Sequence, residues 1–384
     1  MPTTPRDLAL TRRTLLTNLG ALSLSVLSPT VAQARRHDAK LVVVILRGAM
    51  DGLAAVPKPN DPHIRSHRPY LIANDALALR DGFALHPNLA TVHSNFTAGD
   101  AAIVHALAGP WRNRSHFKAQ DLLESGTEKT VLKDGWLNRA LQVSPSPLKA
   151  VSIGPAQPLI LRGKAQAASW SPAVLPEANE DTVNRLLDLY ADDALLGPAL
   201  AEAIKVDQIA GNAAKGLRGN QYVAPMGAAG RLIAADDGPD IAVVSLGGWD
   251  THANQNGVLG NRLKQLDLGL AKLKQELGLH WSKSAVVVVT EFGRTVRQNG
   301  GRGTDHGTGG VGLVLGGAVN GGRILGDWPG LAPNQLYQNR DLYPANDMRG
   351  LLASLLQEQF GFSKSVLTRT VFPGSEGVRM IKAT

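Results

Sequence analysis

Cysteine is absent from this chain of 384 residues. The protein therefore forms no disulfide bond, and no thiolate can act as a metal ligand or as a nucleophile. Any such site must be built from carboxylates, imidazoles and hydroxyls. A chain of this length buries a large apolar core without covalent cross-links, so the absence is compatible with an oxidising compartment.

Long apolar segments are also missing beyond the N-terminal region. There, Arg12 and Arg13 precede a short, mostly apolar stretch at 19–27, and a small-residue Ala-Gln-Ala site ends at Ala34. This combination indicates a secretory signal at 1–34, because the apolar stretch is too short to cross a bilayer. The paired arginines favour twin-arginine export, with the translocase as a transient partner. The alternative is an ordinary secretory signal with two chance arginines.

The positive charge of the chain gives no sign of nucleic-acid binding. Removal of the signal would lower the net charge from +8 to about +6. The basic residues are spread along the sequence, without a lysine–aromatic stripe or a nucleic-acid motif. Solubility and a mild preference for anions are therefore favoured over nucleic-acid binding. We expect a periplasmic or secreted mature protein without a stable membrane anchor.

Apolar runs and amphipathic stretches predict the secondary structure. Runs rich in Val, Ile and Leu without strict alternation are typical of strands buried on both faces. They lie at 41–46, 101–107, 241–246 and 285–290, with weaker candidates at 150–153 and 311–315. Helical periodicity occurs at 117–124, 182–190, 198–209, 262–277 and 351–360. The alternation predicts one α/β domain at 35–384 with helices on both faces of the sheet, and a helical cap or insertion at 155–235.

Acidic and histidine side chains follow three of the predicted strands. The residues at strand ends or in the next glycine-rich loop are Asp51, Asp250, His252, Glu291, Asp305 and His306. We expect them to converge, because sites in open α/β sheets form beyond the carboxyl ends of the strands. Their ligand types favour zinc or manganese and are compatible with calcium or magnesium. Each motif alone is also compatible with a turn, a helix cap, a surface ion pair or a polar loop.

A further polar cluster precedes the helix predicted at 117–124. Ser115 at the helix start is either an N-cap or a nucleophile, since unpaired N–H groups surround such a hydroxyl. Arg114 could neutralise a phosphate or sulfate group through its planar fork. His116 is a candidate base, metal ligand or core residue.

Together these motifs resemble the bacterial family known as domain of unknown function 1501. The matching segments span almost the whole mature chain and lie at 46–53, 85–87, 113–126, 248–252, 290–295 and 303–307. The family in turn resembles the alkaline phosphatase superfamily, which includes sulfatases. The resemblance implies an alkaline-phosphatase-like sheet, one or two divalent metals, and a small anionic ester as substrate.

The resemblance also implies roles for individual residues. It makes Asp51 the first metal ligand, Asp250 and His252 a ligand pair with shortened spacing, and His306 the last histidine. Glu291 stands where an Asp-His pair usually follows a strand, but Phe292 replaces the histidine and cannot bind metal.

The nucleophile position is ambiguous by one residue. In the superfamily it precedes a glycine near the helix end by about ten residues, whereas Ser115 precedes Gly126 by eleven and His116 by ten. If His116 holds the position, the protein is a phosphohistidine variant or has no nucleophile. The absence of cysteine excludes a sulfatase of the cysteine-derived formylglycine type.

Two functions follow from these features. The first is in-line hydrolysis of a phosphate or sulfate ester, in which Ser115 attacks and Arg114, with Arg47 or Arg294, stabilises the anionic transition state. The alternative is a catalytically inactive protein that binds a metal or an anion on the same fold. A metal with a purely structural role would instead be enclosed by its ligands, without an open position.

Overall fold

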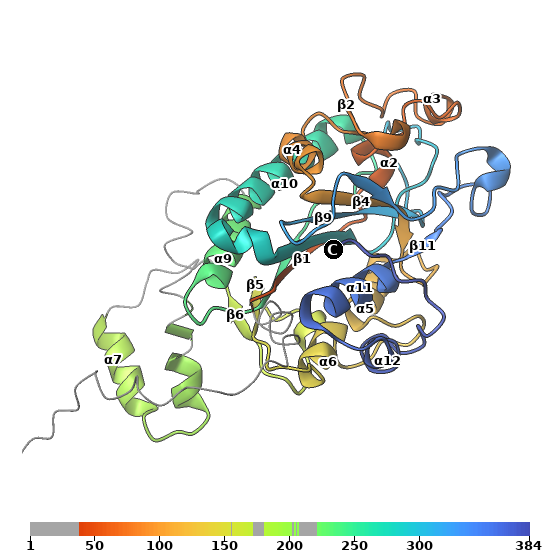
Figure 1. Cartoon of the computed structure of the whole chain (residues 1–384). Coiled ribbons are helices and arrows are strands. Elements are labelled where there is room, and N and C mark those ends of the chain that lie inside the picture. The colour runs from red at the N-terminus through yellow and green to blue at the C-terminus, as the bar shows by residue number, and fades with distance from the viewer. Residues whose placement is uncertain (1–37, 155, 172–179, 202, 205, 207–220) are drawn as a thin grey trace, which may run out of the picture.

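Figure 1 shows one large sheet with helices packed on both of its faces. This computed structural model describes residues 38–384, except 155, 172–179, 202, 205 and 207–220. The signal predicted at 1–34 lies outside the described residues, as do parts of the stretch 155–235. Within the described part, the α/β class predicted from the sequence is confirmed.

Nine described strands form the main sheet. They are β1 (Lys40–Leu46), β4 (Ala101–Ala108), β5 (Ala150–Ile153), β6 (Ala168–Trp170), β7 (Ile241–Leu246), β8 (Ser284–Thr290), β9 (Gly310–Leu315), β10 (Arg323–Leu325) and β11 (Asn346–Asp347). The order is β10-β4-β9-β8-β1-β7-β5-β6, and β11 also pairs with β4. β9 runs antiparallel to β4 and β8, while the other pairs are parallel. The carboxyl ends of β4, β8, β1 and β7 therefore meet at one edge, where β9 begins.

All six strands predicted from apolar runs are confirmed, with bounds that differ by at most one residue. The strands that the patterns missed are short: β6 and β10 have three residues each and β11 has two. A small second sheet pairs β2 (Leu77–Ala78) with β3 (Ala84–Leu85). Segments of two or three residues carry too little periodicity to be recognised in a sequence.

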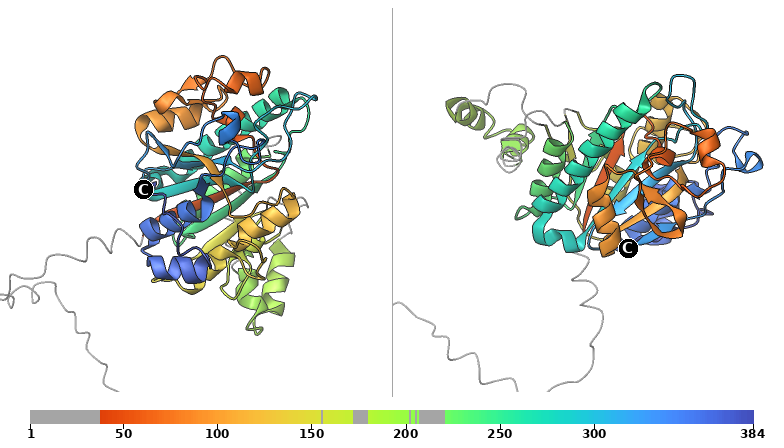
Figure 2. Two further views of the ribbon diagram at one scale, coloured as in Figure 1. Left: turned by 90° about the vertical axis from the view of Figure 1, so that its right-hand side faces the viewer. Right: turned by 90° about the horizontal axis from the view of Figure 1, so that it is seen from above.

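Alternate residues of the strands build two apolar cores. In β1, Val42 faces one core and its neighbour Leu41 faces the other, because successive strand side chains point to opposite faces. The helices of the first core are α4 (Ala90–Ala98), α9 (Val223–Ala234) and α10 (Gln255–Leu277). The helices of the second core are α5 (His116–Ser125), α6 (Trp136–Gln142) and α11 (Met348–Phe360). Figure 2 shows these helices above and below the sheet.

The stretch 155–235 contains more than an insertion. Its β6 extends the sheet edge beside β5, and its α9 packs against the sheet and α10. Helix α7 (Glu180–Leu189), which matches the helix predicted at 182–190, lies away from the sheet in Figures 1 and 2. The helix predicted at 198–209 lies partly outside the described residues.

The described part of the chain also has three short α-helices. They are α2 (Gly52–Ala55), α3 (Ile64–His67) and α12 (Lys364–Val366). Both α2 and α3 follow β1 in the chain. None of the described helices is both long and apolar enough to span a bilayer.

Candidate metal centre

Loops from distant parts of the chain meet at the carboxyl edge of the sheet. They follow β1, β4, β7 and β8, and a further loop at 303–309 leads into β9. Arg294 and His306 form an isolated antiparallel bridge, which joins the last two of these loops. The expected convergence of site residues is therefore built by the sheet itself.

Three imidazoles and one carboxylate face one another at this edge. The Nε2 atom of His116 lies 2.9 Å from Nε2 of His306 and 3.3 Å from Oδ2 of Asp250. The Nε2 atom of His252 lies 3.1 Å from Nε2 of His306 and 2.9 Å from Oδ1 of Asp250. Ligands bound about 2.1 Å from a small divalent ion are separated by about 3.0–3.4 Å. The spacing among His116, Asp250 and His306 fits such an ion, and His252 lies beside these three residues.

The remaining ring nitrogens of His306 and His116 are held by acceptors. The Nδ1 atom of His306 lies 2.8 Å from the carbonyl oxygen of Arg114. The Nδ1 atom of His116 lies 2.7 Å from Oε1 of Glu291. Carbonyl and carboxylate oxygens can only accept, so Nδ1 carries the proton in both rings. Each neutral ring then directs the lone pair of Nε2 into the group.

His252 is fixed in the same way. Its Nδ1 lies 3.3 Å from Oδ1 of Asp305, which also accepts a hydrogen bond from Asn299. Three imidazole nitrogens and the carboxylate of Asp250 thus face one another, an arrangement that is repulsive unless a proton or a metal ion lies among them. The donor set, imidazole nitrogen with carboxylate oxygen, suits a divalent metal.

The centre is open to solvent on one side. The side chains of Asp250 and His252 are 41% and 45% exposed. A small molecule could therefore approach the group directly. Such access is typical of a catalytic metal site, whereas a structural site is closed by its ligands.

Glu291, predicted as a ligand, stands behind His116 instead. Its buried Oε1 accepts hydrogen bonds from the amide of Gly48 (2.9 Å), from Gln120 (2.9 Å) and from His116, while Oε2 accepts one from Thr290. Burial alone would raise the pKa of Glu291, but the hydrogen bonds from His116 and Gln120 outweigh it and lower that pKa. The same bond raises the pKa of His116. Glu291 therefore orients a ligand and polarises it.

Arg294, predicted to bind substrate, contacts a ligand instead. Its buried guanidinium donates from Nη1 to Oδ1 of Asp250 at 2.8 Å and from Nε to Thr304 at 3.2 Å. Burial would raise the pKa of Asp250, and the charge and hydrogen bond of Arg294 more than offset that, so the pKa is lowered. Asp250 is thus held in its anionic form.

The structure does not bring Asp51 into the group. Its carboxylate caps α2 by accepting from the amides of Leu53 and Ala54, and it forms an ion pair with Arg68 at 2.7 Å. The described group that could hold an ion comprises His116, Asp250 and His306, whose ligand atoms all lie within 4.8 Å of one another, with His252 beside it.

The two other arginines expected to bind substrate are paired within the protein. Arg114 donates two hydrogen bonds to the buried carboxylate of Asp341, at 3.0 and 2.7 Å. Arg47 donates to Glu124 at 2.7 Å and to Gln120 at 3.1 Å. Burial raises the pKa of Asp341, although Arg114 and Arg340, which both pair with it, act against that shift. No sequence motif had marked Asp341, which lies 227 residues from its partner.

Ser115 occupies the N-cap position of α5, and its side chain is exposed and makes no capping hydrogen bond. The adjacent amide is held by Asn113, whose side chain accepts from the backbone nitrogen of Ser115 at 2.7 Å. The next residue, His116, turns its ring into the metal group. Ser115 thus keeps its hydroxyl exposed, whereas its neighbour His116 contributes its ring to the metal group.

Close backbone packing brings the loops together. At Gly48, φ is +119°, and a Cβ atom there would lie 2.6 Å from the backbone nitrogen of Asp250. At Gly303 a Cβ atom would lie 2.2 Å from the carbonyl oxygen of His252. Only glycine allows these approaches, which explains part of the glycine content of the motifs.

The family is shown by the match of residues 38–371 to the one described as "Protein of unknown function (DUF1501)". This chain belongs to that family. A search of curated proteins found no match for this DUF1501 chain.

Solved structures resemble the DUF1501 chain at low sequence identity. An alkaline phosphatase from the Antarctic bacterium TAB5 is 12% identical, over 72% of this chain and 91% of that one, with a TM-score of 0.37. A phosphonate monoester hydrolase of Agrobacterium radiobacter is 10% identical, over 74% and 70%, with a TM-score of 0.39. A Bacteroides thetaiotaomicron protein of glycosaminoglycan metabolism is 7% identical, over 89% and 75%, with a TM-score of 0.39. Similarity at this level assigns no reaction, because one fold serves many chemistries.

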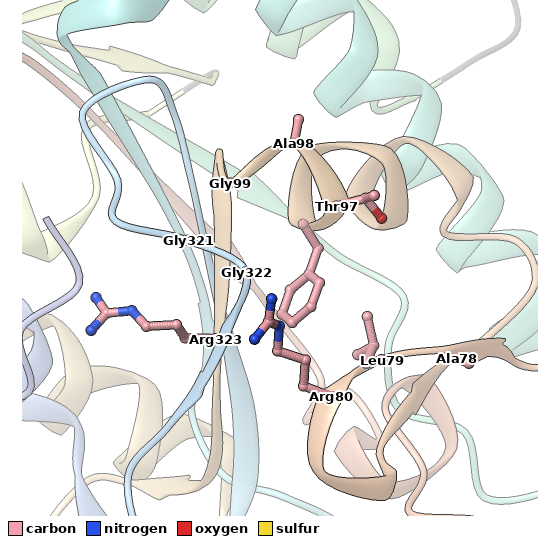
Figure 3. Close-up of a pocket in the computed structure, with 10 residues that line it drawn as sticks. Ala78, Leu79, Arg80, Thr97, Ala98, Gly99, Gly321, Gly322 and Arg323 are labelled. Atoms are coloured by element: carbon pink, nitrogen blue, oxygen red, sulfur yellow. The ribbon is translucent and has the colours of Figure 1, made fainter.

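A separate cavity of about 450 Å³ lies at the opposite end of β4. Arg80, Thr97 and Gly99 are among the residues that line it, as Figure 3 shows. Gly99 precedes the first residue of β4, whereas the metal group lies beyond the carboxyl ends of the strands. None of the predicted site residues lines this cavity.

Proposed function

We propose that this chain is an exported, metal-dependent hydrolase of phosphate or sulfate esters. The observation that carries the proposal is the meeting of three imidazole lone pairs with the carboxylate of Asp250 at a solvent-accessible edge. The two imidazole ligands of His116 and His306, with the carboxylate of Asp250 and the ring of His252 nearby, favour zinc or manganese, because calcium and magnesium prefer oxygen ligands. A divalent ion held there would supply Lewis acidity and lower the pKa of a water molecule beside the ester.

The protein's own contribution is to fix the ligands before an ion binds. His116, His252 and His306 each have one nitrogen held by an acceptor. Their rings therefore lose little freedom on binding, and the tautomer that presents Nε2 is already selected. Asp250 is kept charged by Arg294.

Ser115 is the candidate nucleophile. Its hydroxyl is exposed and unused as a cap, and it stands at the N-terminus of α5, where unpaired N–H groups favour an anionic group. In an in-line displacement this oxygen would lose its proton and form the new bond to phosphorus or sulfur, while the ester oxygen leaves on the opposite side and takes up a proton. Water would then break the serine ester and release phosphate or sulfate. The ring of His116 is committed to the metal group, which favours Ser115 over His116 as the attacking residue.

Export is part of the same proposal. The supporting features are Arg12-Arg13 and the small-residue site ending at Ala34. The twin-arginine translocase would carry the chain already folded, with its ion bound, to the periplasm or beyond. The substrate would then be a small anionic ester of that compartment.

One observation favours a second candidate, a metal-binding protein without turnover. Arg47, Arg114 and Arg294, the three cations expected to meet an anionic substrate, are all paired with carboxylates of the protein. A substrate anion would have to displace these partners or be bound by other groups. Ester turnover by the metal-loaded protein separates the two candidates.

The first test is elemental analysis of the purified protein beside Asp250→Ala and His306→Ala. We expect bound zinc or manganese in the wild type and loss of the ion in both variants. Each variant removes one proposed ligand of the ion, and each of these two side chains lies next to the other members of the group. Asp121→Ala, an exposed carboxylate on α5, is the matched control and should keep the ion. Stoichiometric metal in both ligand variants would refute the shared site.

Activity is then measured on phosphate and sulfate esters with the metal that was found. Turnover that disappears in Ser115→Ala, with metal retained, supports the hydrolase and its nucleophile. Absence of turnover in a metal-loaded wild type supports the binding protein instead.

A further inference from the structure

A buried ion pair joins Arg68 to Asp51, the residue that was expected to be the first metal ligand. The side chains of Arg68 and Asp51 are 0% and 1% exposed, and Nη1 of Arg68 lies 2.7 Å from Oδ2 of Asp51. The rest of the guanidinium is engaged as well, because Nε donates to the carbonyl of Val296 and Nη2 to that of Thr295. Arg68 is thus a fixed cation, fully enclosed by the protein.

The carboxylate of Asp51 has no free position for a metal. Its Oδ1 accepts from the amides of Leu53 and Ala54, and its Oδ2 accepts from Arg68 and, at 2.5 Å, from Nε2 of Gln255. Four donors match the roughly four lone-pair positions of a carboxylate. An ion at Asp51 would have to displace the charge that already balances it.

A directed chain of hydrogen bonds links Asp51 to Asp250. Because Asp51 can only accept, Gln255 must present Nε2 to it and Oε1 to the other side. That Oε1 accepts a hydrogen bond from the hydroxyl of Thr304 at 2.7 Å. The oxygen of the same hydroxyl accepts a hydrogen bond from Nε of Arg294 at 3.2 Å. Arg294 then holds Asp250 through Nη1.

All the intermediate members of this chain are buried. Gln255 and Thr304 are 0% exposed and Arg294 is 1% exposed. Because these side chains are shielded from solvent, water cannot replace a hydrogen bond that is broken between them. The orientation of each side chain therefore depends on its hydrogen-bond partner in the chain. The position of the Asp250 carboxylate is therefore linked to a carboxylate that does not touch the metal group.

We propose that the chain holds one metal ion, because the Arg68 guanidinium occupies the place of a cation at Asp51. Asp51 is then a positioning residue. It orients Asp250 through Gln255, Thr304 and Arg294. The inference rests on the proposed metal centre and specifies its stoichiometry. Asp51 acts on the ion only through the network.

The first experiment counts zinc. Metal-free wild-type protein is titrated with ZnCl₂ and analysed for zinc, beside the double variant Asp51→Asn/Arg68→Met. Removal of both charges avoids leaving one of them buried without a partner, which would be strongly destabilising. We expect one ion per chain in both proteins, bound about 10–100-fold more weakly in the double variant. Two ions in the wild type and one in the variant would make Asp51 a ligand and overturn the proposal.

The second experiment breaks the network without changing charge. Thr304→Val removes the hydroxyl that links Gln255 to Arg294, and it should weaken zinc binding about tenfold, whereas Thr304→Ser should restore it. Thr308→Val is the matched control, since Thr308 is buried in the same loop but donates to the carbonyl of Leu342 instead. Equal zinc affinity in Thr304→Val and Thr308→Val would overturn the positioning role. No zinc bound by the wild type would refute the metal centre itself.

Discussion

Glu291 shows at the scale of one residue how a buried carboxylate can serve a metal centre without touching the ion. The sequence predicted it as a ligand because it follows a strand at the correct edge. Its Oε1 instead joins His116, Gln120 and the amide of Gly48. A histidine whose far nitrogen binds a carboxylate is a more basic ligand with a fixed tautomer.

Substitution Glu291→Gln should therefore weaken zinc binding about 10–100-fold while leaving the ion count unchanged. Glutamine preserves the size of the side chain but removes the charge that supports the ring of His116. Zinc affinity is measured by competition with a chelator of known affinity. The control is Glu276→Gln on α10, which removes a carboxylate paired with Arg231 of α9 and with Lys272 of α10. An equal loss of affinity in the two variants would contradict the role of Glu291.

At the scale of secondary-structure elements, the turn after β1 decides whether the loops can meet. Gly48 has a φ of +119°, which is strained for any other residue, and a Cβ there would lie 2.6 Å from the backbone nitrogen of Asp250. Its own amide donates to Glu291. One residue without a side chain thus joins the loops that follow β1, β7 and β8.

We expect Gly48→Ala to reduce both stability and zinc affinity, with a stability loss of about 1–3 kcal/mol. The new methyl group must push the loop that carries Asp250 and His252 away from His116 and His306. Gly247→Ala is the control in the same loop as Asp250, because a Cβ at Gly247 would meet nothing within 4 Å. Urea unfolding and zinc titration of both variants test this. Normal zinc binding by Gly48→Ala would show that the close approach is dispensable.

The sequence predicts some elements far better than others. The six main strands are readable because each is a compact apolar run that supplies both cores. Helix α9 was missed because Pro225 and glycines interrupt a segment that isolated propensity disfavours. In the structure, these small residues allow close packing on α10, where a Cβ at Gly230 would lie 2.7 Å from the Cβ of Glu276. Tertiary packing, which is absent from local patterns, stabilises this helix.

The candidate site was predictable as a set of positions and only partly as a set of roles. The strand-end rule placed Asp250 and His252 at one edge, and His306, in the glycine-rich loop that follows β8, was expected to join them there. It could not tell that Asp51 faces a guanidinium, because Arg68 belongs to a segment without any motif. Which carboxylate contacts an ion and which contacts an arginine depends on side-chain partners that only the folded arrangement defines.

At the scale of the whole molecule, the antiparallel strand β9 matters most for the site. Because β9 runs against its neighbours, it begins at the edge where β1, β7 and β8 end. The loop that carries Asp305 and His306 therefore reaches the same edge as the other ligands. The ligands come from across the sheet, so ion binding should stabilise the fold as a whole.

Global stability should also depend on a buried histidine that is remote from the metal ligands. His105 lies within β4 with 1% exposure, and its Nε2 donates to the carbonyl of Val56 at 2.9 Å while its Nδ1 accepts from the amide of Ala106. Its ring also packs edge-on against Trp328. Burial lowers the pKa of His105 to about 4. The neutral ring is thus the form that the folded protein accommodates.

The sign of the effect follows from the two pKa values of His105. In the unfolded chain the pKa is about 6.5, so below that pH protonation favours unfolding until the folded pKa near 4 is reached. Stability contributed by the neutral ring is complete above pH 6.5 and declines as the pH falls, by about 2–3 kcal/mol between pH 7.5 and 4.5. Urea unfolding of metal-free protein at both pH values measures this loss.

The variant His105→Gln, whose side chain cannot be protonated, is the control. It should be less stable than the wild type at pH 7.5, but on acidification its free energy of unfolding should fall by about 2–3 kcal/mol less than that of the wild type. Carboxylates titrate in both proteins, so an identical pH dependence would exclude His105 as a source of acid instability.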